Sequence, residues 1–191
     1  MKSANIYQTL EDRDNYEYVK KHGPFFCHER YSNGNLKKGI KEPWLGPGYY
    51  FWDTRIEDAQ WWGKTVYNGK YYICCTTYDQ HSELLYDMVG DLEQFDDFVK
   101  CADYIKHQKI SLKISFPIVL SYLKEHANFN YKAIRVWPYP KNVKETAIKF
   151  PDRKIVLGKA DKIQVCFFDK TLLTEPCSIV PKHVFASNQT I

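Results

Sequence analysis

The sequence predicts a single domain of the α+β class with a mostly antiparallel, split β-sheet. Segments rich in β-branched and aromatic residues fall toward both ends of the chain, and helical segments lie between them. Strands and helices do not alternate in the way that builds a parallel sheet. At 191 residues the chain can bury a full core, and no Pro/Ser-rich linker divides it. We therefore expect residues 1–191 to form one domain.

The composition argues against several classes of protein. The N-terminus has no apolar run of signal-peptide length, and no segment is apolar over a membrane-spanning length. We therefore expect a soluble, cytoplasmic protein with no membrane partner. The 6 cysteines show no Cys-x-x-Cys or Cys/His spacing, which indicates buried thiols and no metal site. The net charge of +4 is too small to indicate nucleic-acid binding by itself.

The N-terminal part is predicted to hold one helix and one short strand. The helix covers residues 9–21 and stops at Gly23 and Pro24. Residues 25–28 form a short apolar segment that ends in a histidine, and a turn cluster follows at residues 32–35.

A glycine-hinged loop opens the most informative stretch, residues 45–63. Gly46 and Gly48 lie on either side of Pro47, whose ring fixes φ. Glycine permits positive φ and a close approach of the backbone, so this loop could bring its main chain against a ligand. An aromatic strand follows directly after the loop.

A helix is predicted to begin at Thr54, directly after this strand. Thr54 with Glu57 three residues later has the spacing of a capping box. The strand would then lead straight into the helix. This geometry would let the rings of Tyr50 and Trp61, one from each element, face each other across a slot.

The rest of the chain is predicted to contain further strands around two helices. The expected helices cover residues 91–107 and 115–126, each with an apolar stripe at helical spacing. Short β-rich segments bounded by Pro, Gly and Asp give the expected strands, at residues 71–78, 131–137, 145–150, 154–157 and 162–168, with weaker pieces to residue 185.

The motif Gly-Pro-Gly-Tyr-Tyr-Phe-Trp-Asp at residues 46–53 resembles a stretch of the poly(ADP-ribose) polymerases and diphtheria-toxin-like ADP-ribosyltransferases. Those enzymes hold nicotinamide with Gly-Lys-Gly-Ile-Tyr-Phe-Ala-Asp and a second Tyr eight residues after the Asp. Tyr50 falls on the first family Tyr and Trp61 on the second, without a gap. The similarity covers about a tenth of the chain. The alternative is an aromatic strand and helix packed into an ordinary core.

The resemblance implies a fold, a substrate and an activity. Proteins of this superfamily have two small antiparallel sheets around an NAD cleft, here with helices inserted in the middle of the chain. The implied activity is NAD-dependent mono-ADP-ribosyl transfer to a protein or nucleic-acid acceptor, a glycosyltransferase reaction in which NAD is a substrate. Catalytic positions would be His28, Tyr50 and Gln164. Some members of the superfamily act as toxins.

The resemblance assigns the histidine position to His28, which would bond a ribose hydroxyl of NAD. Backbone groups of the next residue, Glu29, would clamp the nicotinamide amide. The sequence departs from the family here, because Glu29 replaces a Gly and Arg30 replaces a Ser or Thr. Without the resemblance, His28 would be interpreted as a strand-end histidine with a local hydrogen bond.

The third family position is a glutamate at the start of a late strand, and Gln164 occupies it when Phe168-Asp169 is aligned with the family Tyr-Asp pair. The glutamate stabilises the charge that develops on the ribose as nicotinamide leaves. Gln164 can bond a ribose hydroxyl but carries no charge. Asp161 and Glu145 are alternative carboxylates, and Gln164 could also be an outward-facing polar residue of an amphipathic strand.

Other residues complete the expected NAD site. Gly48 would lie against the dinucleotide with its main chain, and Asp58 would reach the nicotinamide carboxamide from the helix. A basic region could contact an acidic acceptor or the NAD pyrophosphate, or could simply be a solvated face. This region comprises Lys141, Lys144, Lys149, Arg153, Lys154, Lys159 and Lys162.

Three functional hypotheses follow. The first is an ADP-ribosyltransferase with an altered third residue. The second keeps the fold but makes the domain a catalytically inactive binder of NAD, ADP-ribose or nucleic acid. The third takes the motif as accidental and the chain as an aromatic-rich α+β interaction module.

Overall fold

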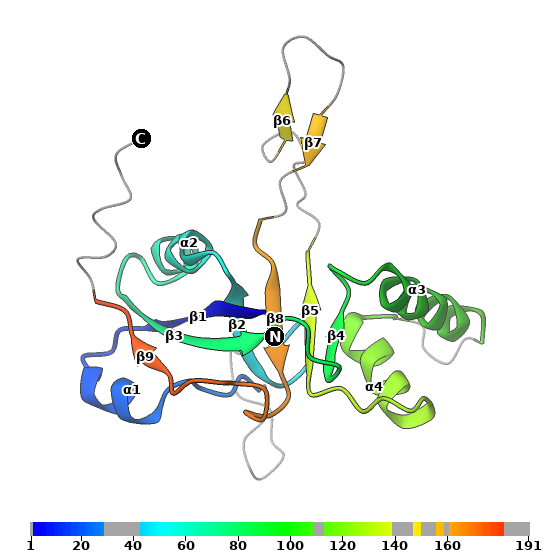
Figure 1. Ribbon diagram of the computed structural model, residues 1–191, viewed down its shortest axis with the longest axis horizontal. Helices are drawn as coiled ribbons and strands as arrows, with labels where there is room; N and C mark the ends of the chain where they lie inside the picture. Colours follow the sequence, from blue (N-terminus) through cyan, green and yellow to red (C-terminus); the bar gives the residue numbers. More distant parts are fainter. Residues whose placement is uncertain are drawn as a thin grey trace.

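The computed structural model describes residues 2–28, 43–108, 113–138, 147–149, 156–158 and 161–181. These ranges contain four helices, a seven-stranded sheet and a separate two-stranded sheet (Figure 1). The elements in chain order are β1 (Ser3–Glu11), α1 (Tyr16–His22), β2 (Tyr49–Asp53), α2 (Ile56–Val66), β3 (Tyr71–Asp79), β4 (Leu85–Asp87), α3 (Leu92–His107), α4 (Phe116–His126), β5 (Ala133–Val136), β6 (Ala147–Lys149), β7 (Val156–Gly158), β8 (Gln164–Phe167) and β9 (Ser178–Ile179).

The large sheet has the strand order β4-β5-β8-β2-β1-β3-β9, and β6 pairs only with β7. The α+β class is confirmed. The prediction of a split antiparallel sheet differs from the structure, in which seven strands form one continuous sheet. All its pairs are antiparallel except β4 with β5, which is parallel. The difference arises because β8, from the last third of the chain, pairs with β2 on one side and β5 on the other.

Three helices cover one face of the large sheet, which we call the α2/α4 face. Thr9 on β1 donates a hydrogen bond to the backbone oxygen of Ala59, which places α2 on this side. Trp52 pairs with Tyr7, two residues from Thr9, and packs with Ala59 in the same apolar cluster. Tyr50 shares this face because side chains two residues apart on a strand point the same way. It packs against the cluster that α3 and α4 form with β5 and β8.

The opposite face, which we call the α1 face, carries the shortest helix. Val19 of α1 packs against Tyr72 and Cys74 of β3. Figure 1 shows α1 and α2 on opposite sides of β1 and β3. A second buried cluster lies on this face, where the rings of Phe51 and Tyr78 each meet Phe167 edge-on, 5.6 and 5.5 Å away.

A network of buried charges joins the strands on the α1 face. The Asp53 carboxylate lies at the end of β2 and is buried. It accepts hydrogen bonds from Arg135 Nε at 2.7 Å, Tyr78 Oη at 3.0 Å and Gln80 Nε2 at 3.2 Å. Arg135 also donates to both oxygens of Asp87 at 3.1 Å. The network therefore connects β2, β3, β4 and β5 through one guanidinium group.

The prediction of a helix over residues 9–21 was wrong in its first half. β1 continues to Glu11, whose backbone pairs with Tyr71, and α1 begins only at Tyr16. Nine consecutive residues of β1 pair with β3, about 60 to 76 positions away in the chain. This long-range pairing overrides the local helix-start signal at residues 9–12.

The predicted start of the next helix at Thr54 was also wrong. α2 begins at Ile56, its N-cap residue is Arg55, and no side chain caps it. Thr54 has φ +58° and donates its N–H to the Asn5 backbone oxygen. The hydrogen bond to β1 therefore holds Thr54 in the sheet region and prevents the capping box.

The remaining predictions agree more closely with the structure. The segments at 71–78, 91–107 and 115–126 correspond to β3, α3 and α4, and Asp91 caps α3 through its side chain. β5 and β8 are shorter than expected, and parts of the predicted strands 145–150 and 154–157 lie outside the described residues. The segment 25–28 forms only an isolated bridge between Cys27 and Gly48, and β4 was not predicted.

No disulfide joins any of the six cysteines in the described structure, but their burial differs from the expectation. Cys74 and Cys166 are buried, whereas Cys27 is exposed. None of the described helices combines the length and apolar character needed to cross a bilayer. Within the described ranges, no group of three His, Cys, Asp or Glu side chains is placed to hold a metal ion.

We expect Asp53→Ala to lower the free energy of unfolding by about 3–5 kcal/mol, because it leaves Arg135 buried without its closest counter-charge. Urea unfolding followed by circular dichroism measures the change. Asp97→Ala is the matched control, because Asp97 pairs with Lys100 on the exposed surface of α3. An Asp53→Ala variant as stable as this control would contradict the role given to the network.

Candidate functional site

Tyr50 holds the glycine-hinged loop onto the sheet. Its hydroxyl accepts a hydrogen bond from Leu45 N–H at 2.8 Å and donates one to the Gly46 oxygen at 2.7 Å. Gly46 has φ +84°, a conformation that favours glycine. Burial raises the pKa of the Tyr50 hydroxyl, so it stays protonated and can donate at neutral pH. The phenol is therefore engaged within the protein, and its hydroxyl supports the loop.

Gly48 lacks a side chain because the late strand passes close to it. A Cβ at this position would lie 2.3 Å from Cys166 Sγ and 2.8 Å from the Phe167 oxygen. Its backbone N–H and oxygen both bond to Cys27. The backbone of Gly48 therefore lies close to β8 and to Cys27, and this packing explains why the position needs a glycine.

Gln164 lies on the strand next to Tyr50. Trp52 pairs with Gln164 and Tyr50 pairs with Cys166, so Tyr50, Trp52 and Gln164 share the α2/α4 face. Trp44 Nε1 donates a hydrogen bond to Gln164 Oε1 at 2.7 Å. The Gln164 NH₂ group is a donor that can meet a ligand, and the amide oxygen keeps a second lone pair.

Trp61 presents an exposed indole on the same face. Its side chain is on α2, 40 % exposed, and its ring meets Trp52 edge-on at 6.2 Å. Lys162 Nζ lies 4.1 Å from the centre of the Trp61 ring, a cation–π contact. Lys162 comes two residues before Gln164, so the start of β8 lies close to α2.

Asp58 ties α2 to the start of β8. Its Oδ2 accepts the Lys162 N–H at 2.8 Å and lies 3.5 Å from Arg55 Nε. Burial raises the pKa of the Asp58 carboxyl, while the hydrogen bond from Lys162 and the charge of Arg55 act in the opposite direction. Asp161 also raises the pKa of Asp58 by charge repulsion. Among the described residues, the buried Oδ1 of Asp161 has no hydrogen-bond partner.

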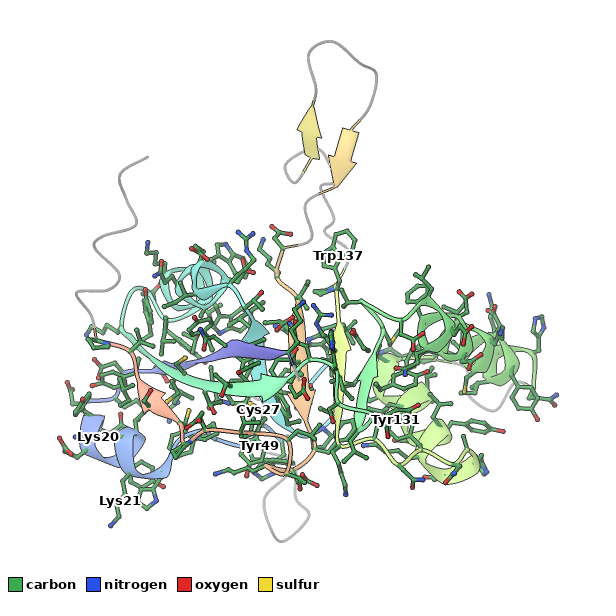
Figure 2. The ribbon with its side chains drawn as sticks, viewed as in Figure 1. Lys20, Lys21, Cys27, Tyr49, Tyr131 and Trp137 are labelled. Carbon is green, nitrogen blue, oxygen red and sulfur yellow. The ribbon has the colours of Figure 1, made fainter. Side chains whose placement is uncertain are left out.

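His28 lies on the other side of the sheet. Its ring is 5.9 Å from Phe26, and Phe26 meets Tyr49 edge-on at 5.0 Å. Tyr49 packs with the buried cluster of the α1 face, opposite to Tyr50. In Figure 2 the labelled Cys27 and Tyr49 lie close together below the centre of the sheet.

The structure thus brings Tyr50, Asp58, Trp61 and Gln164 to the α2/α4 face and places His28 away from them. Glu29 and Glu145 lie outside the described residues. The side chains of the predicted basic region also lie outside the described part of the chain, except that of Lys162.

Trp44 is the site residue that the sequence did not predict. Its ring is 37 % exposed and meets Phe116 of α4 edge-on at 5.6 Å. Its position beside the glycine-hinged loop is the one signal that could have pointed to it. Nothing local indicates that its indole N–H reaches residue 164.

A scan against protein-family models found no match, and neither did searches of curated proteins and of solved structures. The functional argument therefore depends on the residues and on their arrangement.

We expect Tyr50→Phe to destabilise the protein by about 1–3 kcal/mol, because the Leu45 N–H and the Gly46 oxygen lose their common partner. Thermal or urea unfolding measures the loss. The control is Tyr104→Phe, which removes a hydroxyl from an exposed ring of α3. Unchanged stability in Tyr50→Phe would mean that the hydroxyl does not hold the loop.

Asp58→Asn tests the buried carboxyl through the pH dependence of stability. A raised pKa in the folded state means that the charged form is disfavoured on folding. The contribution of this carboxyl to stability therefore falls as the pH rises above 3.8, the ordinary pKa of an Asp side chain. Asparagine keeps an oxygen for the Lys162 N–H and removes the charge. The variant should therefore gain stability relative to the wild type as pH rises from about 3 to 7. A stability difference independent of pH in urea unfolding would contradict this, and exposed Asp97→Asn is the control.

Proposed function

We propose that the protein is an NAD-dependent ADP-ribosyltransferase that uses the α2/α4 face around Trp61 and Gln164. One observation carries the proposal. The aromatic motif and the strand with the third position pair directly, Tyr50 with Cys166 and Trp52 with Gln164. These are the two segments that the sequence resemblance singles out. Their pairing supports the alignment of Gln164 with the catalytic glutamate of that superfamily.

The exposed groups on this face fit the parts of NAD. The Trp61 indole offers an apolar surface on which a flat pyridine ring can stack. The Gln164 NH₂ group, oriented by Trp44, can donate to a ribose hydroxyl. The Lys162 ammonium group beside Trp61 can attract a phosphate. Tyr50 would act indirectly in this arrangement, by holding the loop that carries Trp44.

The transfer reaction sets a further requirement. The bond between ribose C1′ and nicotinamide breaks, nicotinamide leaves with the electron pair, and an acceptor oxygen or nitrogen forms a new bond to C1′. The acceptor releases a proton. Positive charge develops on the ribose, and a nearby carboxylate or amide oxygen stabilises it. Asp161, three residues before Gln164, is the carboxylate that we assign to proton uptake from the acceptor.

A second candidate function is NAD binding without turnover. The specific observation in its favour is the hydrogen bond from Trp44 to Gln164. This bond uses one lone pair of the amide oxygen, and Gln164 presents a neutral amide, with its NH₂ group as donor, where the superfamily has a carboxylate. A neutral donor binds hydroxyl groups but does not offset developing positive charge.

Calorimetry and a nicotinamide-release assay separate the two functions. The wild type should bind NAD, and Trp61→Ala should weaken binding about 5- to 100-fold through loss of stacking. Tyr104→Ala, which removes an exposed ring from α3, is the matched control. A wild type that does not bind NAD would remove both proposals.

Gln164→Glu tests the transfer reaction itself. A carboxylate can still accept the Trp44 N–H, so the fold should be preserved. We expect nicotinamide release to rise about 10- to 1,000-fold, as for other charge-stabilising groups. NAD binding with no release by the wild type and none by Gln164→Glu would leave the binding function and rule out the transferase.

A further inference from the structure

Aromatic rings lie along the α1 face in two groups, which the chain joins at Phe25 and Phe26. Tyr18 of α1 stacks on Phe25 with ring centres 5.8 Å apart and planes 12° apart. The next residue, Phe26, meets Tyr49 edge-on at 5.0 Å. His22 extends the row at one end, 4.5 Å from Tyr18. We call Tyr18, His22, Phe25, Phe26 and Tyr49 the ring row.

Much of the ring row faces solvent. Tyr18 is 56 % exposed and Phe26 is 40 % exposed. Val19 is the one buried residue of α1, so the aromatic rings of this helix are not buried. Tyr16, also on α1, is 43 % exposed. Exposed apolar rings that gather on one face mark an interaction site more often than scattered single residues do.

A buried glutamine fixes the centre of the row. Gln8 of β1 donates its Nε2 to the Phe25 oxygen at 2.9 Å and accepts the Phe25 N–H through Oε1 at 2.7 Å. Gln8 is only 4 % exposed. Both backbone groups of Phe25 are therefore bonded to the sheet. The backbone that carries the Phe25 ring is held in place before any ligand arrives, which reduces the entropy lost on binding.

Lysines lie at both ends of the ring row. Lys20 and Lys21 are in the last turn of α1, and Lys20 Nζ lies 6.0 Å from the Tyr16 ring centre. At the other end, Lys170 Nζ lies 5.2 Å from the Tyr49 ring centre. The neighbouring carboxylate, Asp169, lies 3.5 Å from Lys132. Figure 2 shows Lys20 and Lys21 on α1, with Tyr49 further along the same side of the molecule.

We propose that the ring row binds single-stranded nucleic acid. Unpaired bases stack on exposed aromatic rings, and ammonium groups along the same path attract the phosphates. A base pair in a duplex keeps its faces stacked on its neighbours and cannot use such a row. The lysines at both ends of the ring row give it positive charge, which complements the phosphates of a nucleic-acid strand.

This inference is independent of the NAD proposal. The ring row lies on the α1 face, whereas Gln164 and Trp61 lie on the α2/α4 face. Strand binding should therefore not require NAD, and failure of one proposal leaves the other unchanged.

Fluorescence anisotropy with a labelled 12-nucleotide pyrimidine strand, in RNA and DNA forms, tests the proposal. The wild type should bind at low salt and weaken as salt rises. Tyr18→Ala and Phe26→Ala should each weaken binding about 5- to 100-fold. The double variant Lys20→Glu/Lys21→Glu should weaken binding and reduce its salt dependence.

The controls are Tyr104→Ala and Lys100→Glu, an exposed ring and an exposed lysine on α3, which should bind as the wild type does. Circular dichroism checks folding, and the lysine variant carries the test if an aromatic variant unfolds. Three results would overturn the proposal: no strand binding, equal loss in the controls, or tighter binding of the matching duplex. Sedimentation showing a dimer that Tyr18→Ala dissociates would instead assign the row to contact between two copies of the chain.

Discussion

A buried carboxylate needs hydrogen-bond donors around it, and Asp53 obtains them from Tyr78, Gln80 and Arg135. These donors come from β3, from the residue that follows it and from β5, so the network fixes the distance between strands that do not touch. Unpaired charge in this position would be costly. Arg135 needs a second carboxylate as well, and Asp87 supplies it from β4. The packing of the helices on the other face depends on a sheet held in this arrangement.

Local signals in the sequence were sufficient for elements whose stability is mostly local. α3 and α4 have continuous apolar stripes and begin beside Asp91 and Ser115, as predicted. β1 was missed because its pairing with β3 depends on residues far away in the chain. The start of α2 was misplaced for a related reason, since the backbone of Thr54 bonds to Asn5. A capping-box pattern cannot reveal such a competing partner.

The sequence indicated some residues that share the candidate face, but it did not indicate their contacts. The resemblance selected Tyr50 and Gln164, and the pairing of β2 with β8 places them on neighbouring strands with their side chains on one face. It did not indicate that the Tyr50 hydroxyl bonds to the loop, because that depends on how residues 43–48 fold back. Trp44 was not predicted because its hydrogen-bond partner, Gln164, is 120 positions away in the chain. His28 was assigned by its place in the sequence, whereas its ring lies with Phe26 on the opposite side.

Gln8 has a consequence that extends through the sheet. Its amide Nε2 donates hydrogen bonds to the backbone oxygen of Phe25 at 2.9 Å and to the backbone oxygen of Tyr50 at 3.3 Å. One side chain thus touches the segment that displays the aromatic rings and the strand that anchors the glycine loop. Neither segment can shift without stretching a bond shared with the other. The two sides of the domain therefore share one hydrogen-bonding side chain of β1.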